Sequence, residues 1–189
     1  PESAIHYAHE LGTCEAADLP QGCDLEDISG EALWLDFDAD SLSVHLLSFE
    51  EHAAESRAES VFSGLTLNRP ETTVESMNGV LQKHFSNFLD QNTVLKDFPG
   101  RRGHGYKPLR SDIKAMVTSG DPLPGSLEAV RLAIYRISPD LAKLIRDSAD
   151  PSLALATGAA LRAREMWDQP EKYYPYVQYL VEDLSHDEL

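Results

Sequence analysis

Three carboxylates occupy alternate positions in one short stretch of this 189-residue sequence, and a serine follows them. These residues are Asp36, Asp38, Asp40 and Ser41. Alternate residues of a strand project to the same side, so Asp36 and Asp38 would share a face if the strand continued regularly. Two-metal phosphodiester cleavage uses carboxylates that hold two ions about 4 Å apart. With Glu75 on a following helix, one hypothesis is therefore a metal-dependent nuclease.

The residues around these carboxylates predict a β-hairpin. Residues 32–37 form an almost unbroken apolar run, which is typical of a strand buried on both faces. Residues 38–41 supply a polar turn, and the apolar–polar alternation over 42–46 predicts an adjacent antiparallel strand. A weaker alternation over 55–67 predicts a third strand, so the three strands would form a meander.

Helices are expected on both sides of this meander. A short helix is predicted over residues 2–11, with Gly12 where it would stop. Thr72 and Glu75 fit a capping box, and apolar residues at three-and-four spacing predict a helix over 73–90. His84 lies beside this apolar stripe, and we expect a satisfied or half-exposed histidine there rather than a metal ligand.

The second half of the chain continues with alternating strands and helices. We expect a strand over 113–117, a helix capped by Ser126, and a fifth strand over 141–145. Asp150 and Pro151 then predict the start of a helix over 152–167. This helix is rich in alanine and glycine, so we expect it to approach a neighbouring element closely and to be buried against the sheet.

Two further segments are candidate partner surfaces. The only basic cluster of the sequence lies in the irregular stretch 92–110, where it is either a solvated loop or a site for an anion or acidic partner. An aromatic strip after residue 168 either packs back on its own domain or docks a partner. The candidate residues are Arg101, Arg102, His104, Lys107, Arg110, Tyr173, Tyr174, Tyr176 and Tyr179.

Composition narrows the class of partner. The formal net charge is −16, which argues against duplex nucleic acid and against an anionic membrane, because both require a positive field. No apolar run approaches the length of a membrane span, and no secretory signal is found at the start. The sequence starts at Pro1 rather than at methionine, so we expect a fragment. Cys14 and Cys23 are expected to be free thiols unless the compartment is oxidising.

The last four residues, His186-Asp187-Glu188-Leu189, match an endoplasmic-reticulum retention signal. Such a signal acts only at a true C-terminus and in a protein that enters the secretory route. A cytoplasmic location is therefore favoured, with the lumen of the endoplasmic reticulum as the alternative if the tetrapeptide is functional.

Four segments together resemble the second lobe of the seventy-kilodalton heat-shock chaperones, members of the actin-like ATPase superfamily. Residues 1–8 (PESAIHYA) resemble the opening Glu-Pro-x-Ala-Ala-x-x-Tyr-Gly helix, and 35–47 resemble the phosphate hairpin, Asp-Leu-Gly-Gly-Gly-Thr-x-x-Val-x-x-Leu. Residues 117–124 (VTSGDPLP) lie where the adenosine loop, Val-Gly-Gly-Ser-x-x-x-Pro, would be. Residues 150–160 (DPSLALATGAA) are similar to the Asn-Pro-Asp-Glu-Ala-Val-Ala-x-Gly-Ala-Ala helix.

The resemblance implies an α/β fold of ribonuclease-H-like type, a single lobe with a mixed sheet of about five strands and flanking helices. That lobe would span residues 1–167, followed by an aromatic and acidic tail over 168–189. A degenerate phosphate hairpin would be formed by Asp36, Asp38, Asp40 and Ser41. The adenosine loop would be formed by Ser119, Gly120, Asp121 and Pro124.

Departures from the family pattern imply lost catalysis. The glycines that let backbone N–H groups wrap a phosphate are replaced by Asp38, Ala39 and Asp40. The first glycines of the adenosine loop are replaced by Thr118 and Ser119. The family's long insertion is missing between residues 91 and 113, and its first lobe is not in this sequence.

The resemblance therefore implies a non-catalytic lobe, a pseudo-ATPase without cofactor that binds a protein partner or regulates a larger protein. One alternative is the adenine-nucleotide-binding half of a two-lobed chaperone ATPase. It would bind ATP or ADP with Mg²⁺ and would need a first lobe upstream of Pro1. The second alternative is the nuclease that uses Asp36, Asp38 and Glu75.

Overall fold

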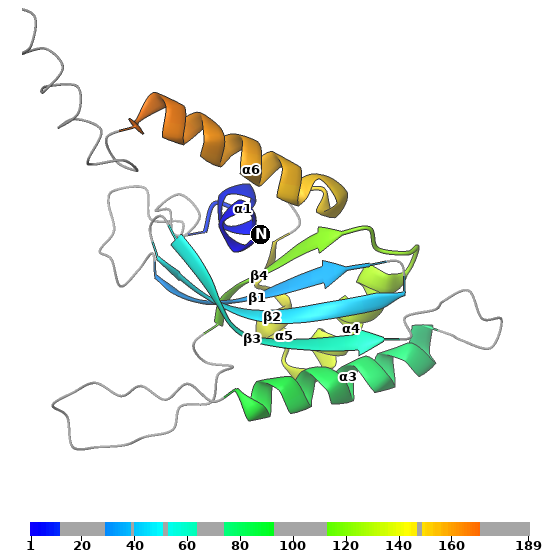
Figure 1. Ribbon diagram of the computed structural model, residues 1–189. Helices are drawn as coiled ribbons and strands as arrows, with labels where there is room; N and C mark the ends of the chain where they lie inside the picture. Colours follow the sequence, from blue (N-terminus) through cyan, green and yellow to red (C-terminus); the bar gives the residue numbers. More distant parts are fainter. Residues whose placement is uncertain are drawn as a thin grey trace, which may run out of the picture.

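A mixed five-stranded sheet forms the centre of the molecule (Figure 1). The computed structural model describes residues 1–11, 29–38, 40–50, 53–63, 74–92, 113–146 and 149–170. The strand order is β3-β2-β1-β4-β5. The first three strands pair antiparallel as the predicted meander, and β4 and β5 add parallel to β1. The strands are β1 (Gly30–Phe37), β2 (Ser41–Glu50), β3 (Ala53–Ser63), β4 (Ile113–Gly120) and β5 (Ile145–Arg146).

Helices cover both faces of this sheet (Figure 1). The described helices are α1 (Glu2–Ala8), α3 (Val74–Gln91), α4 (Ser126–Ile137), α5 (Pro139–Ala142) and α6 (Pro151–Asp168). Helices α3 and α4 lie on one face, and α1 and α6 lie on the other. The predicted α/β class, with a mixed sheet of five strands and flanking helices, is confirmed. None of the described helices has the length and apolarity that a bilayer crossing requires.

Strand β1 belongs to both hydrophobic cores. Leu33, Leu35 and Phe37 pack in the core shared with α3 and α4. Ala32 and Trp34 pack in the second core, shared with α1 and α6. This alternation confirms the prediction of a strand buried on both faces. Fully burying one such large side chain stabilises a fold by roughly 1.5–3 kcal/mol, so loss of β1 would damage both cores.

A buried asparagine joins the two helices of the first face. The Asn78 side chain of α3 is fully buried, and its Nδ2 donates to the carbonyl oxygen of Ala129 at 3.2 Å. Its Oδ1 accepts a hydrogen bond from Arg136 Nη1 at 2.8 Å. His84, on the same helix, is half-buried and lies 3.4 Å from Ser60 Oγ through its Nε2, as expected of a satisfied histidine.

On the opposite face α6 approaches α1 closely. Gly158 lies so close to α1 that a Cβ atom there would be 1.7 Å from the carbonyl oxygen of Ala4. The expected close approach is therefore confirmed. The prediction that this helix is buried against the sheet is only partly correct, because α6 packs mainly on α1 and only partly on β4. Only Ala154 and Gly158 of α6 are buried, since α1 lies between most of this helix and the strands.

Two local predictions near α4 are wrong. Ser126 is not the N-cap, because Gly125 occupies that position with φ of 86° and Ser126 is already helical. The fifth strand covers Ile145–Arg146 and not residues 141–145. Ser138 accepts a hydrogen bond from the backbone N–H of Leu141, which starts a short helix at Pro139 and delays the strand.

Side-chain hydrogen bonds attach α1 to the sheet. His6 Nε2 donates to the carbonyl oxygen of Glu50 at 2.8 Å, and His9 Nε2 donates to the carbonyl oxygen of Thr118 at 3.0 Å. Arg146 Nη1 donates to the His9 carbonyl oxygen at 2.8 Å. A seven-residue helix is marginal in isolation, so these bonds and the contact with α6 hold α1 in place.

The contact at Gly158 predicts opposite effects for two glycine substitutions. We expect Gly158→Ala to lower the free energy of unfolding by about 1–3 kcal/mol, because the new methyl group would collide with the α1 backbone. Gly79→Ala is the matched control, because nothing lies within 4 Å of its added Cβ and the residue is helical. This control should stabilise by about 0.5–1 kcal/mol. Urea denaturation of both variants tests the pair, and equal effects would contradict the close packing.

Burial of His9 predicts a loss of stability in mild acid. Burial lowers the pKa of His9 below its ordinary value; the bond to Thr118 opposes the shift, and the positive charge of Arg146 adds to it. The unfolded chain then binds a proton more readily than the folded chain. Stability should be complete above about pH 6.5 and fall as the pH drops below it.

His9→Gln keeps a side-chain N–H and does not titrate, so it should weaken this pH dependence. Burial also lowers the pKa of the less buried His84, so His84→Gln should remove a smaller part. Thermal unfolding from about pH 7.5 to about pH 5 measures the effect. An unchanged pH dependence in His9→Gln would contradict it.

Candidate functional site

The two loops that the sequence predicted as a phosphate hairpin and an adenosine loop begin side by side. They start at the carboxyl ends of the parallel strands β1 and β4, where Asp36 is paired with Ser119 and Phe37 with Gly120. Asp36 and Ser119 are 83 residues apart in sequence, and only the β1–β4 pairing brings them together. The carboxyl ends of neighbouring parallel strands are a common place for ligands in α/β proteins.

A chain of hydrogen bonds fixes the first carboxylate. Trp34 Nε1 donates to Ser119 Oγ at 2.7 Å, and the Ser119 hydroxyl donates to Asp36 Oδ1. Trp34 and Ser119 are both buried, whereas Asp36 is half-buried at the open end of the strands. One oxygen of Asp36 is therefore already bonded within the protein.

The loop after β4 turns so tightly that its glycine is required. Gly120 has φ of 88°, and an added Cβ would lie 1.8 Å from the carbonyl oxygen of Phe37. The backbone N–H of Asp121 donates to that same oxygen at 2.9 Å. This glycine therefore lets the β4 loop lie directly against the end of β1.

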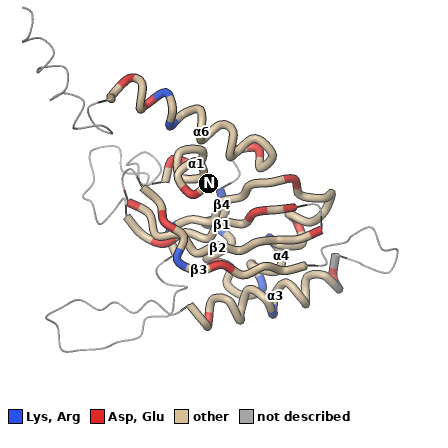
Figure 2. The backbone as a smooth tube through the Cα atoms, viewed as in Figure 1, with Lys and Arg blue, Asp and Glu red and all other residues tan. Residues whose placement is uncertain are grey.

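Carboxylates gather at this end of the strands (Figure 2). Asp38 and Asp40 are exposed in the turn between β1 and β2, where Asp38 N donates to the Ser41 carbonyl oxygen at 3.0 Å. Asp121 is also exposed, at the start of the β4 loop. The turn therefore presents negative side chains to solvent beside the end of β1.

Two residues of this site were not predicted from the sequence. Trp34 was treated as part of the apolar run, and His45 as an outward residue of the second strand. Their rings stack with centroids 4.3 Å apart and an interplanar angle of 20°. A buried indole N–H needs an acceptor, so a tryptophan within a buried strand is a signal for a polar partner nearby.

The nuclease hypothesis gains no support from this arrangement. Leu35 and Phe37 face α3, so strand alternation places Asp36 on the opposite face of the sheet from Glu75 of α3. Across the described ranges, no three His, Cys, Asp or Glu side chains lie close enough to hold a metal ion.

Of the remaining candidate residues, Pro124 alone lies in the part of the chain that the structure describes. Pro124 is exposed in the loop that leads into α4. The basic and tyrosine candidates all lie outside the described residues; they are Arg101, Arg102, His104, Lys107, Arg110, Tyr173, Tyr174, Tyr176 and Tyr179.

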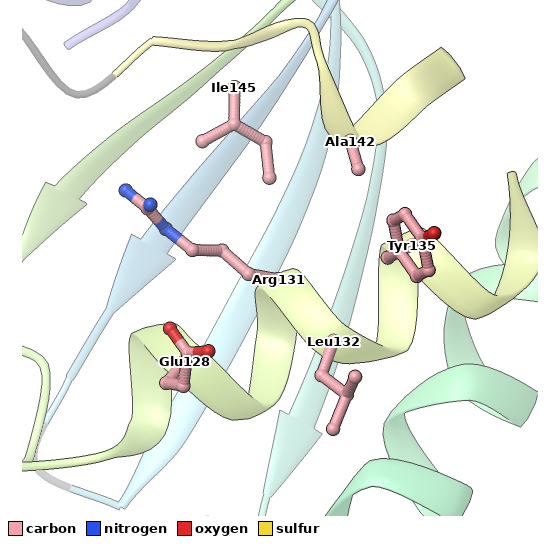
Figure 3. A pocket seen from close by; sticks show the side chains of 6 residues that line it. All are labelled: Glu128, Arg131, Leu132, Tyr135, Ala142 and Ile145. Carbon is pink, nitrogen blue, oxygen red and sulfur yellow. The ribbon is translucent and has the colours of Figure 1, made fainter. Parts of the chain in front are cut away.

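A separate groove of about 320 Å³ lies beside β5 (Figure 3). Four of its residues follow one another along α4 and face α5 and β5, which supply the other two. Its apolar side chains adjoin one carboxylate and one guanidinium, which do not specify a ligand. The lining residues are Glu128, Arg131, Leu132, Tyr135, Ala142 and Ile145.

Two comparisons with known proteins identify no relative of this chain. No protein-family model matches the chain, and a search of curated proteins finds no match.

The hydrogen-bond chain predicts opposite effects for two neighbouring residues of β4. Ser119→Ala would leave the buried Trp34 N–H without its acceptor, so we expect a loss of about 1–3 kcal/mol of stability. The adjacent Thr118 hydroxyl is buried without a hydrogen-bond partner, so the isosteric change Thr118→Val should be neutral or stabilising. Chemical denaturation compares the two variants. Equal stability of Ser119→Ala and the wild-type chain would show that the bond contributes nothing.

Proposed function

We propose that this chain is a single actin-like lobe that does not hydrolyse ATP and acts as a protein-interaction or regulatory module. Support comes first from the order of the described elements, which is helix, three-strand meander, helix, strand, helix, strand and helix. The heat-shock-chaperone resemblance implies this order, and the short helix α5 is one addition to it. The family assignment rests on this order and on the motifs in the sequence.

The observation that carries the proposal is the junction between the two loops. The β4 loop keeps a left-handed glycine, Gly120, against the end of β1, as a nucleotide-binding loop would require. Beside it, however, the hairpin turn carries the exposed carboxylates Asp38 and Asp40. The arrangement of a nucleotide site is therefore combined with side chains that oppose a phosphate.

The size of this opposition follows from Coulomb's law. Two like unit charges 4 Å apart repel by about 1 kcal/mol in water and by about 4 kcal/mol near a protein surface. Asp38 and Asp40 together would therefore weaken phosphate binding strongly unless a cation intervened. The formal net charge of −16 acts in the same direction. The favoured partner of the lobe is a protein, which includes a further lobe of a longer polypeptide.

Calorimetric titration with ATP and with ADP, each with and without Mg²⁺, tests this proposal. We expect no binding heat from the wild-type chain, because the turn presents carboxylates where backbone N–H groups should face phosphate. Micromolar, Mg²⁺-dependent ATP binding would overturn the proposal. The double variant Asp38→Asn with Asp40→Asn separates the effect of the negative charge from the effect of the missing glycines. If charge alone prevents binding, this variant should gain weak ATP affinity while its β1–β2 turn stays intact.

The position of Gly120 also favours one alternative, a residual adenine-nucleotide site. In that case ADP and adenosine would bind with similar weak affinity and without Mg²⁺, since the phosphates would contribute little. Loss of this binding in Gly120→Ala would not show that the loop binds the nucleotide, because that variant also disturbs the contact with β1. Pro124→Ala is the better test, because Pro124 is exposed in the loop.

A further inference from the structure

Asn78 and Gly79 of α3 form the only asparagine–glycine step of the sequence. An asparagine loses its side-chain amide when the backbone nitrogen of the next residue attacks its Cγ atom. Glycine favours this attack, because it has no Cβ atom to hinder the approach and its backbone reaches conformations that other residues avoid. This step is therefore the position of the chain where deamidation is chemically easiest.

The reaction runs in two stages through a five-membered imide ring. The Gly79 nitrogen loses its proton and bonds to the Asn78 Cγ atom, and the side-chain amide leaves as ammonia. Water then opens the ring at one of its two carbonyl carbons. Opening at the side-chain carbonyl gives aspartate, whereas opening at the backbone carbonyl gives isoaspartate, in which the main chain runs through the former side chain. One water is consumed and one ammonia is released, so no cofactor or redox partner is needed.

The folded chain restrains both reacting groups. The Asn78 side chain is 0% exposed; its Nδ2 donates to the carbonyl oxygen of Ala129 at 3.2 Å, and its Oδ1 accepts from Arg136 Nη1 at 2.8 Å. The Gly79 nitrogen lies within α3, and in an α-helix each backbone N–H donates to the carbonyl four residues earlier. Closing the imide ring requires a backbone conformation at Asn78 that is not helical. The attack therefore needs α3 to open at this point.

The start of α3 is a weak part of the helix. Asn78 is the fifth residue of α3, and helix ends open more readily than helix centres. Gly79 is exposed, has nothing within 4 Å of an added Cβ, and weakens a helix interior. Val80 after it is 52% exposed. The two bonds of Asn78 to α4 are therefore the polar contacts that oppose opening at this point.

We propose that Asn78–Gly79 is a deamidation site that becomes reactive when the contact between α3 and α4 opens, and that the reaction then prevents this contact from re-forming. Aspartate has no N–H to donate, so its carboxylate would lie against the Ala129 carbonyl oxygen in a buried position. Isoaspartate lengthens the main chain by one carbon atom, so the helical hydrogen bonds cannot continue through it. The neighbours Met77 and Leu81 belong to the first core, which would lose their packing.

Peptide mass spectrometry of the full chain tests the site, after incubation in mildly alkaline buffer with and without guanidinium chloride. We expect Asn78 to convert readily in the denaturant and more than about tenfold more slowly in the folded chain, because the rate follows the population of the open form. Asn87 is an internal control, since it is exposed on the same helix but is followed by Phe88. Its conversion should stay small in both samples. Equal rates at Asn78 in both samples, or no reaction in the denaturant, would overturn the proposal.

Arginine variants test whether the α3–α4 contact controls the rate. Arg136→Ala removes one partner of the Asn78 carboxamide, so deamidation of the folded chain should be about three to ten times faster. Arg164→Ala is the matched control, because Arg164 forms an exposed ion pair with Asp168 on α6 and should leave the rate unchanged. Equal rates in the two variants would overturn the proposed control by this contact.

A third variant separates local opening of α3 from unfolding of the whole chain. Gly158→Ala disturbs the packing of α6 on α1, on the opposite face of the sheet from α3. If α3 opens locally, this variant should deamidate at the wild-type rate. An acceleration as large as that of Arg136→Ala would show that global unfolding exposes the site, and would overturn the local mechanism.

Asn78→Asp reproduces the aspartate product and tests its effect on the fold. Asn87→Asp is the matched control, because it adds the same charge to an exposed position of the same helix. We expect Asn78→Asp to unfold at a lower denaturant concentration than the wild-type chain, whereas Asn87→Asp should unfold close to it. Equal midpoints for the two variants would contradict the proposed loss of the α3–α4 contact.

Discussion

The burial of β1 between two cores is the constraint on which the rest of the structure depends. This strand pairs with β2 on one edge and with β4 on the other, and its side chains enter the cores on both faces of the sheet. A one-residue slip of its register would exchange the two cores, placing Trp34 against α3 and Leu35 against α1. The same register places Asp36 beside Ser119. The candidate site is therefore a consequence of packing that the fold already requires.

This dependence explains why the site joins a buried network to exposed charge. Trp34 lies in the second core, and its N–H must be satisfied there, which it is through Ser119. Ser119 in turn bonds Asp36 at the point where the strand reaches solvent. The Ser119 hydroxyl thus connects the packing of the second core with the charge of Asp36. The carboxylates of the turn can therefore change without loss of this network, because the network also supports the core.

The elements with strong local signals were predictable from the sequence, and the contacts between distant residues were not. The apolar run of β1 was predicted correctly because it is short and ends at a polar turn, and α3 was predicted correctly because three-and-four spacing fits the helical period. The pattern around residue 141 fits both a strand and a helix, and Ser138 decided it by capping α5. The bond from Trp34 to Ser119 spans 85 residues, so no local pattern indicates it. The conformation of Gly125, which displaced Ser126 as the cap, is likewise set by the loop that precedes it.

The contact between α1 and α6 also affects when the fold can be completed. These helices are separated by more than 140 residues in sequence, yet they pack against each other and enclose the second core. At a synthesis rate of about 5–20 residues per second, α1 would leave the ribosome roughly 7–30 seconds before α6. During that interval the first core can form and α1 can cover Trp34 and Leu47, whereas the outer side of α1 still lacks α6. The nascent chain therefore presents a half-finished apolar face, which a cell must protect from aggregation until α6 emerges.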